Sequence, residues 1–267
     1  MTGIATRTIA CAGGMPAFVA VPDAPARMPA VIVVHERYGL VRHICDLAER
    51  FARDGFVAIA PDLYFQHPDQ AALHRGDAGC DVADPDALVA LGAAIEALHA
   101  IPQADTTRLA IMGICQTARL PLVVAAGRPI AAALVWYGAA QPREWAVNDK
   151  YPRALDEIIA AVDCPVLGMF GETDHLISLD DVRHLRDRLE RHGNSYDIHV
   201  YRDAPHGWLN DTMPGRYRRA QAEAAWADQR AFLARVLAPG GDRSTRMQRY
   251  AVDSALDYDF SRNVRHE

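Results

Sequence analysis

The segment Arg108-Leu-Ala-Ile-Met-Gly-Ile-Cys115-Gln-Thr-Ala-Arg-Leu-Pro-Leu-Val-Val-Ala-Ala126 contains two apolar runs separated by a short turn. The first run, residues 108–112, has the length and composition of a buried strand, and the second, residues 120–126, is typical of a buried helix. A residue between such a strand and such a helix lies at the carboxyl end of the strand, where α/β proteins bind ligands. The segment therefore predicts an α/β fold with Cys115 at a strand-to-helix turn.

Similar apolar runs recur on both sides of this segment. Gly13-Gly14 separates the first two runs and predicts an antiparallel hairpin. From residue 30 onward the runs alternate with helical patterns, which favours a mostly parallel sheet of about eight strands with helices on both faces. The predicted strands are 4–10, 17–21, 30–34, 56–60, 108–112, 131–136, 165–170 and 196–201. The predicted helices begin after Gly39 and at residues 87, 120, 182 and 216.

The same pattern predicts one α/β domain over residues 1–239. Residues 62–85 have no clear period and are rich in Asp, Gly and Pro, so they are predicted to form a long surface excursion. Residues 240–267 are polar and weakly patterned. This tail is either mobile or packed on a neighbouring subunit, and the sequence leaves open whether the protein is a monomer or a homo-oligomer.

Composition excludes several classes of function. The 267 residues are 50% hydrophobic and 23% charged, as in ordinary globular proteins, and the net charge is −6. No block of like charges is present, which argues against binding to nucleic acid or to a membrane surface. The N-terminal residues lack a signal-peptide pattern, and no apolar run is long enough for a bilayer.

The cysteine and histidine spacings predict neither a disulfide framework nor a metal site. Five cysteines form no CxxC pair. His35-Glu36 and His43 do not have HExxH spacing. We therefore expect a cytoplasmic protein with reduced thiols, no metal and no cofactor, acting on a small molecule.

Four polar residues follow the predicted strands closely enough to lie at the ligand-binding edge of the sheet. These residues are Glu36, Cys115, Asp174 and His206. Cys115 at the start of a helix is in the setting of a nucleophile elbow, where the helix N-terminus favours the reactive thiolate. The alternative is a buried, inert cysteine, and we interpret the other four cysteines in that way.

His206 and Asp174 complete a candidate catalytic triad with Cys115. His206 is predicted to lie in a loop before the last helix, where it can act as a base. Asp174 follows a strand and can orient the imidazole, although an aspartate there can equally be a turn or N-cap residue. The chain order nucleophile, acid, histidine is the order used by α/β-hydrolases.

At five separate motifs the chain resembles the dienelactone hydrolase family of α/β-hydrolases. His35-Glu36-Arg37-Tyr38-Gly39-Leu40 is similar to the family's H-E-x-x-G-L, and residues 56–64 (FVAIAPDLY) are similar to its second strand. Gly113-Ile114-Cys115 resembles the start of its nucleophile elbow. Gly171-Glu172 with Asp174, and His206-Gly207-Trp208, resemble its acid and histidine loops. The likeness covers roughly residues 4–237.

The resemblance implies roles that spacing alone does not reveal. Glu36 is expected beside the cysteine, holding the thiol protonated until substrate binds. The backbone N–H groups of Gln116 and Arg37 are expected to form the oxyanion hole. The candidate substrate-binding residues are Arg75, Tyr137, Trp208 and Asn210.

Two positions depart from the family pattern. Thr117 stands where the family has a very small residue, and a β-branched side chain needs extra room in a tight crossing. This predicts a rearranged pocket floor or weaker catalysis. Asn210 stands where family members that act on dienelactone have an arginine for the substrate carboxylate. Without that guanidinium the sequence favours a neutral or differently charged ester.

The sequence thus predicts a hydrolase that opens a carboxylic ester or lactone through Cys115, His206 and Asp174. Two alternatives stay open. One is a non-catalytic binding or regulatory relative, which Thr117 motivates, and the other is a thioesterase or another hydrolase on the same scaffold. Neither the natural substrate nor the pathway follows from the sequence.

Overall fold

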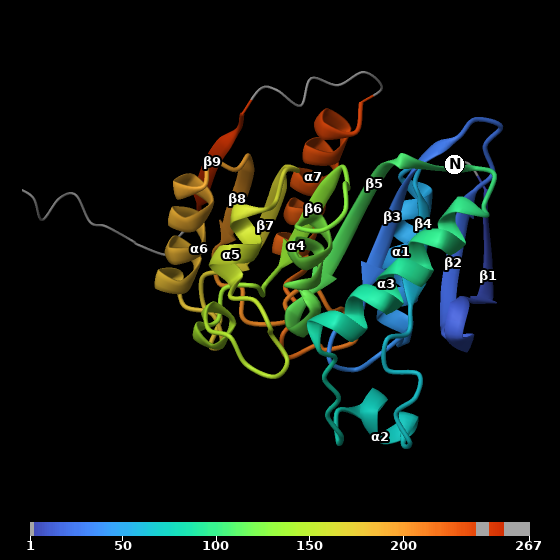
Figure 1. The fold of residues 1–267 in the computed structure, drawn as a ribbon, viewed down its shortest axis with the longest axis horizontal. Coiled ribbons are helices and arrows are strands. Elements are labelled where there is room, and N and C mark those ends of the chain that lie inside the picture. Colours follow the sequence, from blue (N-terminus) through green and yellow to red (C-terminus); the bar gives the residue numbers. More distant parts are fainter. Residues whose placement is uncertain (1–2, 239–245, 254–267) are drawn as a thin grey trace, which may run out of the picture.

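A single twisted sheet forms the centre of the computed structural model, which describes residues 3–238 and 246–253. The sheet has nine strands in the order β1-β2-β4-β3-β5-β6-β7-β8-β9 (Figure 1). Strand β2 pairs antiparallel with β1 and β4, and every other pair of neighbouring strands is parallel. The strands are β1 (Ile4–Ala10), β2 (Pro16–Pro22), β3 (Met28–Val34), β4 (Val57–Pro61), β5 (Ala104–Ile114), β6 (Ala132–Trp136), β7 (Val166–Gly171), β8 (Tyr196–Tyr201) and β9 (Gln248–Val252).

Helices cover both faces of the sheet. The α-helices are α1 (Arg42–Arg53), α2 (Gln70–Arg75), α3 (Asp84–His99), α4 (Leu120–Ala125), α5 (Leu155–Ala160), α6 (Leu179–Arg191) and α7 (Arg219–Val236), with short 3-10 turns at η1 (Ala12–Gly14), η2 (Cys115–Thr117) and η3 (Pro142–Trp145). None of the described helices combines the length and apolar character that crossing a bilayer requires.

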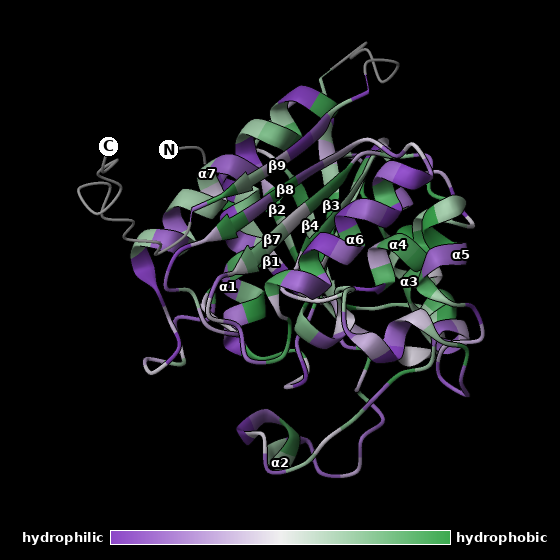
Figure 2. Ribbon diagram, turned by 90° about the vertical axis from the view of Figure 1, so that its left-hand side faces the viewer, coloured by the Kyte–Doolittle hydropathy of each residue, from purple (hydrophilic) through white to green (hydrophobic). Residues whose placement is uncertain are grey.

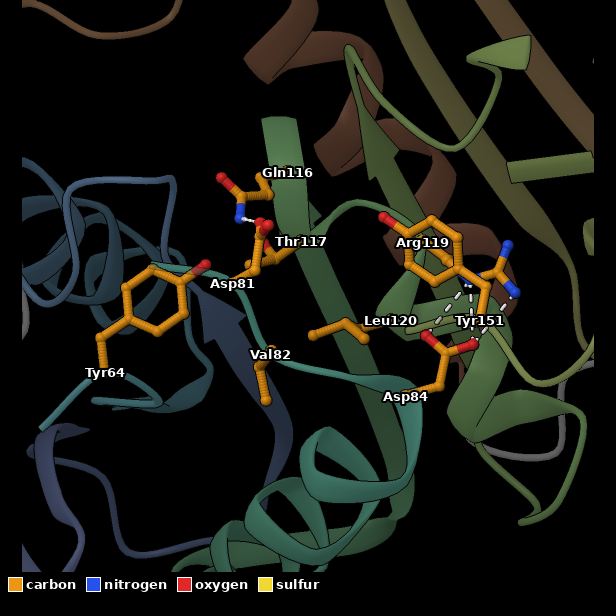
Figure 3. Close-up of a pocket in the computed structure, with 9 residues that line it drawn as sticks. All are labelled: Tyr64, Asp81, Val82, Asp84, Gln116, Thr117, Arg119, Leu120 and Tyr151. Carbon is orange, nitrogen blue, oxygen red and sulfur yellow. Dashed lines mark hydrogen bonds and ion pairs between the residues drawn. The ribbon is translucent and has the colours of Figure 1, made fainter. Parts of the chain in front are cut away.

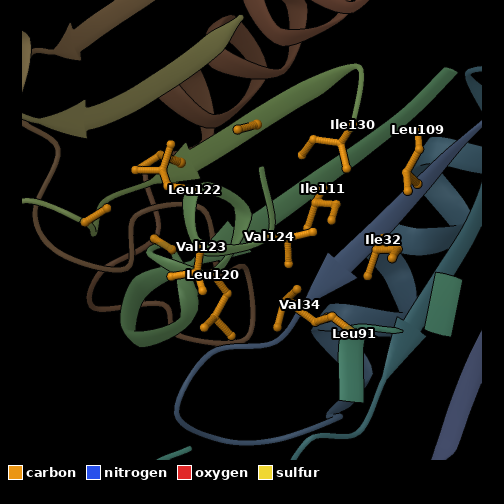
Figure 4. Packing of buried hydrophobic residues seen from close by; sticks show 14 of the residues in the cluster. Ile32, Val34, Leu91, Leu109, Ile111, Leu120, Leu122, Val123, Val124 and Ile130 are labelled. Atoms are coloured by element: carbon orange, nitrogen blue, oxygen red, sulfur yellow. The ribbon is translucent and has the colours of Figure 1, made fainter. Parts of the chain in front are cut away.

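The residues of β3 show how the sheet builds two cores. Val31 and Val33 pack with α1 and α7, whereas Ile32 and Val34 pack with α3 and α4 on the other face (Figure 4). Successive side chains of a strand point to opposite faces, so a strand covered on both sides must be apolar throughout. Polar residues colour the outer surfaces of the helices, and the strands between them are largely apolar (Figure 2).

The predicted fold is confirmed, with one strand more than expected. All eight predicted strands are present as β1–β8, and Gly13 and Gly14 form the predicted hairpin turn with positive φ angles of 74° and 77°. Strand β9 lies within the segment that the sequence analysis assigned to a polar tail. It pairs with β8 at the sheet edge, where a strand needs little apolar character because one edge and much of its side-chain surface face solvent. Residues 240–245 and 254–267 of that segment lie outside the described residues.

The excursion at residues 62–85 projects beyond the end of the sheet where the parallel strands finish (Figure 1). It contains helix α2, which the sequence analysis did not predict. Asp69 caps this helix by accepting a hydrogen bond from the Ala72 backbone N–H at 2.8 Å, and Gly76 ends it with a φ of 81°. The excursion returns to the carboxyl ends of the strands at residues 79–82, which lie against the end of β5 that carries Cys115.

Candidate active site

Cys115 occupies a strained turn directly after β5. Its φ of 59° lies in the left-handed region, which a non-glycine residue adopts only when its surroundings enforce it. Close packing enforces it here, because a Cβ atom built on Gly138 would lie 2.2 Å from the Cys115 carbonyl oxygen. Cys115 therefore lies in the strained strand-to-helix turn that the sequence predicted, with its side chain half-buried at the carboxyl end of β5.

Thr117 fits this elbow without displacing it. Its side chain is buried, and its hydroxyl donates to the carbonyl oxygen of His35 at 2.8 Å. The Thr117 hydroxyl oxygen also accepts a hydrogen bond from the Ile114 backbone N–H at 3.1 Å. The tight crossing needs small residues at Gly113 and Gly138 instead, where an added Cβ would clash with the elbow backbone. The elbow thus accommodates the Thr117 side chain, and weaker catalysis stays a prediction.

The structure brings Cys115, His206 and Asp174 together from three loops. The Nε2 atom of His206 lies 3.0 Å from the Cys115 Sγ atom, and its Nδ1 atom lies 2.8 Å from an Asp174 carboxylate oxygen. The other Asp174 oxygen accepts hydrogen bonds from the backbone N–H groups of Leu176 and Ile177 at 2.8 and 3.1 Å. The carboxylate is thus fixed in the orientation that holds the imidazole between it and the sulfur.

These contacts control the charge of His206. Burial lowers the pKa of the imidazole, but its hydrogen bonds to Asp174 and Cys115 outweigh this effect and raise the pKa to about 10. An imidazolium between a sulfur and a carboxylate can stabilise a thiolate and can later supply a proton to a leaving group.

Glu36 lies in the same buried region but does not contact the sulfur directly. Its side-chain oxygens accept hydrogen bonds from the Tyr137 hydroxyl at 3.3 Å and from the Asn210 amide at 2.7 Å. The Asn210 carbonyl oxygen is occupied by the Thr212 hydroxyl and backbone N–H, which fixes the amide with its nitrogen toward Glu36. Among the described residues no hydrogen bond joins Glu36 to Cys115.

Tyr137 lies between Glu36 and the triad. Its ring centroid is 5.2 Å from that of His206, and its side chain is fully buried. Burial and then the nearby Glu36 carboxylate raise the pKa of the Tyr137 hydroxyl well above its ordinary value, so the group stays protonated and donates to Glu36.

None of the four predicted substrate-binding residues lines the pocket that holds Cys115. Arg75 lies on α2 and pairs with Asp77 at 2.9 Å, with both side chains exposed. Trp208 is fully buried among the rings of Trp136, Tyr137 and Tyr201. Aromatic side chains that follow a catalytic histidine pack into the core as readily as they face a ligand, and the sequence offers no signal that separates the two cases.

The backbone N–H groups of Gln116 and Arg37, the candidates for an oxyanion hole, lie on two neighbouring segments. Gln116 lies in the first turn of η2, where backbone N–H groups have no acceptor within the helix. Arg37 follows β3, the strand next to β5, so its backbone lies near the elbow. Its N–H donates to no other backbone group of the described chain.

The Gln116 side chain has a separate contact that the sequence did not reveal. Its amide nitrogen donates to the Cys80 carbonyl oxygen at 2.8 Å and to the Asp81 carboxylate, which also pairs with Lys150 (Figure 3). The end of the 62–85 excursion is thereby tied to the residue that follows Cys115.

A buried ion pair between Arg119 and Asp84 holds the same region in place. The Arg119 guanidinium contacts both carboxylate oxygens of Asp84 at 3.0–3.2 Å (Figure 3). It also donates to the carbonyl oxygens of Glu144 and Arg153. It also lies 4.4 Å from the centre of the Tyr151 ring. Arg119 lies directly before α4. Its side chain thus links that helix to the start of α3 and to the loop around η3.

Comparison with known proteins identifies the family of the chain. The profile of the dienelactone hydrolase family matches residues 15–237. The chain belongs to the dienelactone hydrolase family. Two bacterial proteins that carry the name "Putative carboxymethylenebutenolidase" are similar to it. The one from Methylorubrum extorquens is 30% identical over 220 residues, which cover 80% of this chain and 74% of the relative. The one from Salmonella typhimurium is 34% identical over 218 residues, covering 79% of each chain.

Solved structures place the fold in the same family. A "Putative Dienelactone Hydrolase" from Klebsiella pneumoniae superposes with a TM-score of 0.76 at 30% identity, covering 88% of this chain and 99% of the other. The dienelactone hydrolase-like phosphotriesterase P91 from metagenomic libraries superposes with a TM-score of 0.71 at 20% identity, covering 87% and 98% of the two chains, and shows the fold alone. The protein is a hydrolase of the dienelactone hydrolase type with the α/β-hydrolase fold.

Proposed function

We propose that this dienelactone hydrolase-like enzyme opens a carboxylic ester or lactone of a small molecule through a thioester on Cys115. The observation that carries the proposal is the continuous set of short contacts from the Cys115 sulfur through His206 to Asp174. A binding module has no need for a strained cysteine, an imidazole and an oriented carboxylate in one line.

The reaction follows from this arrangement. The Cys115 thiolate attacks the carbonyl carbon, and the resulting oxyanion is stabilised by the backbone N–H groups of Gln116 and Arg37. The His206 imidazolium then protonates the leaving alkoxide as its bond to the carbonyl carbon breaks, which leaves an acyl-enzyme. Water attacks the thioester with His206 as the base, which releases the acid and returns the thiolate.

In this proposal Glu36 controls the protonation of the Cys115 thiol. Its carboxylate faces the neutral donors of Tyr137 and Asn210, so in this conformation it is held apart from the thiol. The resemblance implies that the same glutamate takes the thiol proton. Release of the Asn210 contact is the movement that would let it reach the sulfur.

The test is hydrolysis of p-nitrophenyl acetate by the wild-type protein and by Cys115→Ala, with Cys80→Ala as the matched control because Cys80 is the other thiol of the same pocket. We expect Cys115→Ala to lose the activity and Cys80→Ala to keep it. Equal rates in wild type and Cys115→Ala would exclude the cysteine mechanism.

A further inference from the structure

A second and larger cavity lies beside the pocket that holds Cys115. Its volume is about 870 Å³, and its main walls are the hairpin turn at residues 12–15, residues 63–68 of the excursion and one side of α3. We call this cavity the α3 groove. A concave site of this size is within the range that small-molecule ligands occupy in proteins.

Apolar side chains from three segments line the α3 groove. Met15 comes from the hairpin turn, Leu63 and Phe65 from the excursion, and Val82 from the segment before α3. Leu63, Phe65 and Val82 are only partly buried, so part of their apolar surface remains in contact with water. An apolar group that covered this surface would bind favourably, because both surfaces would leave water.

Helix α3 turns one of its faces to the groove. The lining residues of this face are Asp86, Val89, Ala90, Ala93 and Glu96. Val89 is 76% exposed, and the alanines leave space beside it. From the hairpin turn, a Cβ atom built on Gly13 would meet no other atom within 4 Å. The groove is therefore open because small residues flank it on two of its walls.

The charge of the groove disfavours an anionic ligand. Its carboxylate side chains are Asp81, Asp86 and Glu96, and the described lining residues include no Lys or Arg. A second carboxylate placed among them would be repelled by like charges. The α3 groove is thus suited to a neutral apolar group.

The α3 groove adjoins the pocket in which the proposed reaction takes place. Cys80 and Asp81 line both cavities. Their segment is held against the elbow, because the Gln116 side-chain amide donates to the Cys80 carbonyl oxygen at 2.8 Å. A molecule whose ester group lies at Cys115 therefore reaches the groove by extending across residues 80–81.

We propose that the α3 groove binds an apolar acyl chain of the substrate while the ester carbonyl lies at Cys115. This inference rests on the proposed function and names the substrate class of that site, which is esters with an extended, uncharged acyl group. Each methylene that moves from water to apolar surface raises kcat/KM by up to about fourfold. An acetyl group is too short to leave the Cys115 pocket and serves as the reference.

The test compares kcat/KM for p-nitrophenyl octanoate and p-nitrophenyl acetate, both below the concentration at which the longer ester forms micelles. We expect wild type to favour the octanoate by about tenfold or more. Ala90→Trp and Ala93→Trp place an indole in the groove, and each should lower the octanoate-to-acetate ratio by about fivefold or more. Val89→Ser, a change at an exposed position that leaves the packing of α3 intact, should lower it by about twofold.

Leu88→Trp is the matched control. Leu88 lies on the same helix and is 41% exposed, but it does not line the groove, so this variant should keep the wild-type ratio. Unchanged ratios in the three groove variants would overturn the proposal, as would an equal fall in Leu88→Trp. Light scattering covers the remaining occupant. If Ala93→Trp turns a dimer into a monomer and leaves the ester ratio unchanged, the groove is an interface between copies and the proposal fails.

Cys115→Ala separates this inference from the proposed function. If hydrolysis requires Cys115 but wild type shows no preference for the octanoate, the hydrolase mechanism stands and the acyl site fails. If Cys115→Ala hydrolyses both esters at wild-type rates and the preference still depends on Ala90 and Ala93, the acyl site stands and the cysteine mechanism fails.

Discussion

The two walls of the pocket around Cys115 are built in different ways. One wall consists of strand ends and carries Cys115, Asp174 and His206, whose contacts are short and largely buried. The other consists of residues 79–82 and the loop around η3, and an exposed pair between Asp81 and Lys150 helps to hold it. The strand-end wall thus holds the residues of the proposed reaction in fixed contacts, whereas the loop wall encloses the pocket with contacts that are partly exposed.

The largest expected effect tests the strand-end wall. We expect His206→Ala to reduce kcat for p-nitrophenyl acetate by about a thousandfold or more, as is typical when a triad base is removed. The matched control is His175→Ala, because His175 is exposed and its ring lies 6.0 Å from that of His206. A similar loss in both variants would show that any change near Asp174 disturbs the site.

The buried ion pair between Arg119 and Asp84 should contribute strongly to the free energy of unfolding. Arg119→Met leaves the Asp84 carboxylate buried without its partner, which typically costs about 3–5 kcal/mol of unfolding free energy. Urea denaturation measures this value. Arg183→Ala, which breaks an exposed pair with Asp180, should change it by less than about 1 kcal/mol. A small effect of Arg119→Met would mean that the loop wall does not depend on this ion pair.

The pH dependence of the unfolding free energy should report on the contact between His206 and Asp174. A raised His206 pKa means that the folded state binds this proton more tightly than the unfolded state. The stabilisation is complete below the ordinary histidine pKa of about 6.5 and is lost as pH rises towards about 10. We expect Asp174→Asn to flatten this fall in unfolding free energy between those limits, measured by urea denaturation across the range. If the unfolding free energy falls equally with pH in wild type and in Asp174→Asn, the contact between His206 and Asp174 does not raise the pKa of His206.

The smallest expected effect concerns the loop wall. Lys150→Ala removes the exposed partner of Asp81 and should lower the unfolding free energy by less than about 1 kcal/mol. The Gln116 amide still contacts Asp81 in this variant, so the loop wall should stay in place. Urea denaturation measures the change. A loss of several kcal/mol would mean that the exposed pair, and not the buried contacts, holds the loop wall.

Much of the strand-end wall could be predicted from sequence because its signals are local. The apolar runs give strands, the residue after each run lies at the sheet edge, and the φ of 59° at Cys115 is the conformation that a strand-to-helix turn requires. The fit of Thr117 could not be predicted, because its hydroxyl bonds to the carbonyl oxygen of His35, a residue distant in sequence that follows β3.

The contacts of the loop wall could not be predicted either, because they too depend on residues that are distant in the sequence. Its contacts join residues distant in sequence, such as Gln116 to Cys80 and Arg119 to Asp84. No periodic pattern reports such pairs. Strand β9 was missed because an exposed edge strand does not need the continuous apolar run that identified the central strands.

The most direct test of the central claim is to trap the acyl-enzyme. After rapid acid quenching of the reaction with p-nitrophenyl acetate, mass spectrometry of the digested protein should find an acetyl group on the Cys115 peptide during turnover. The group should be absent after the substrate is exhausted and absent in Cys115→Ala. Steady hydrolysis by wild type with no acetyl group on Cys115 at any time, together with undiminished hydrolysis by Cys115→Ala, would contradict the account.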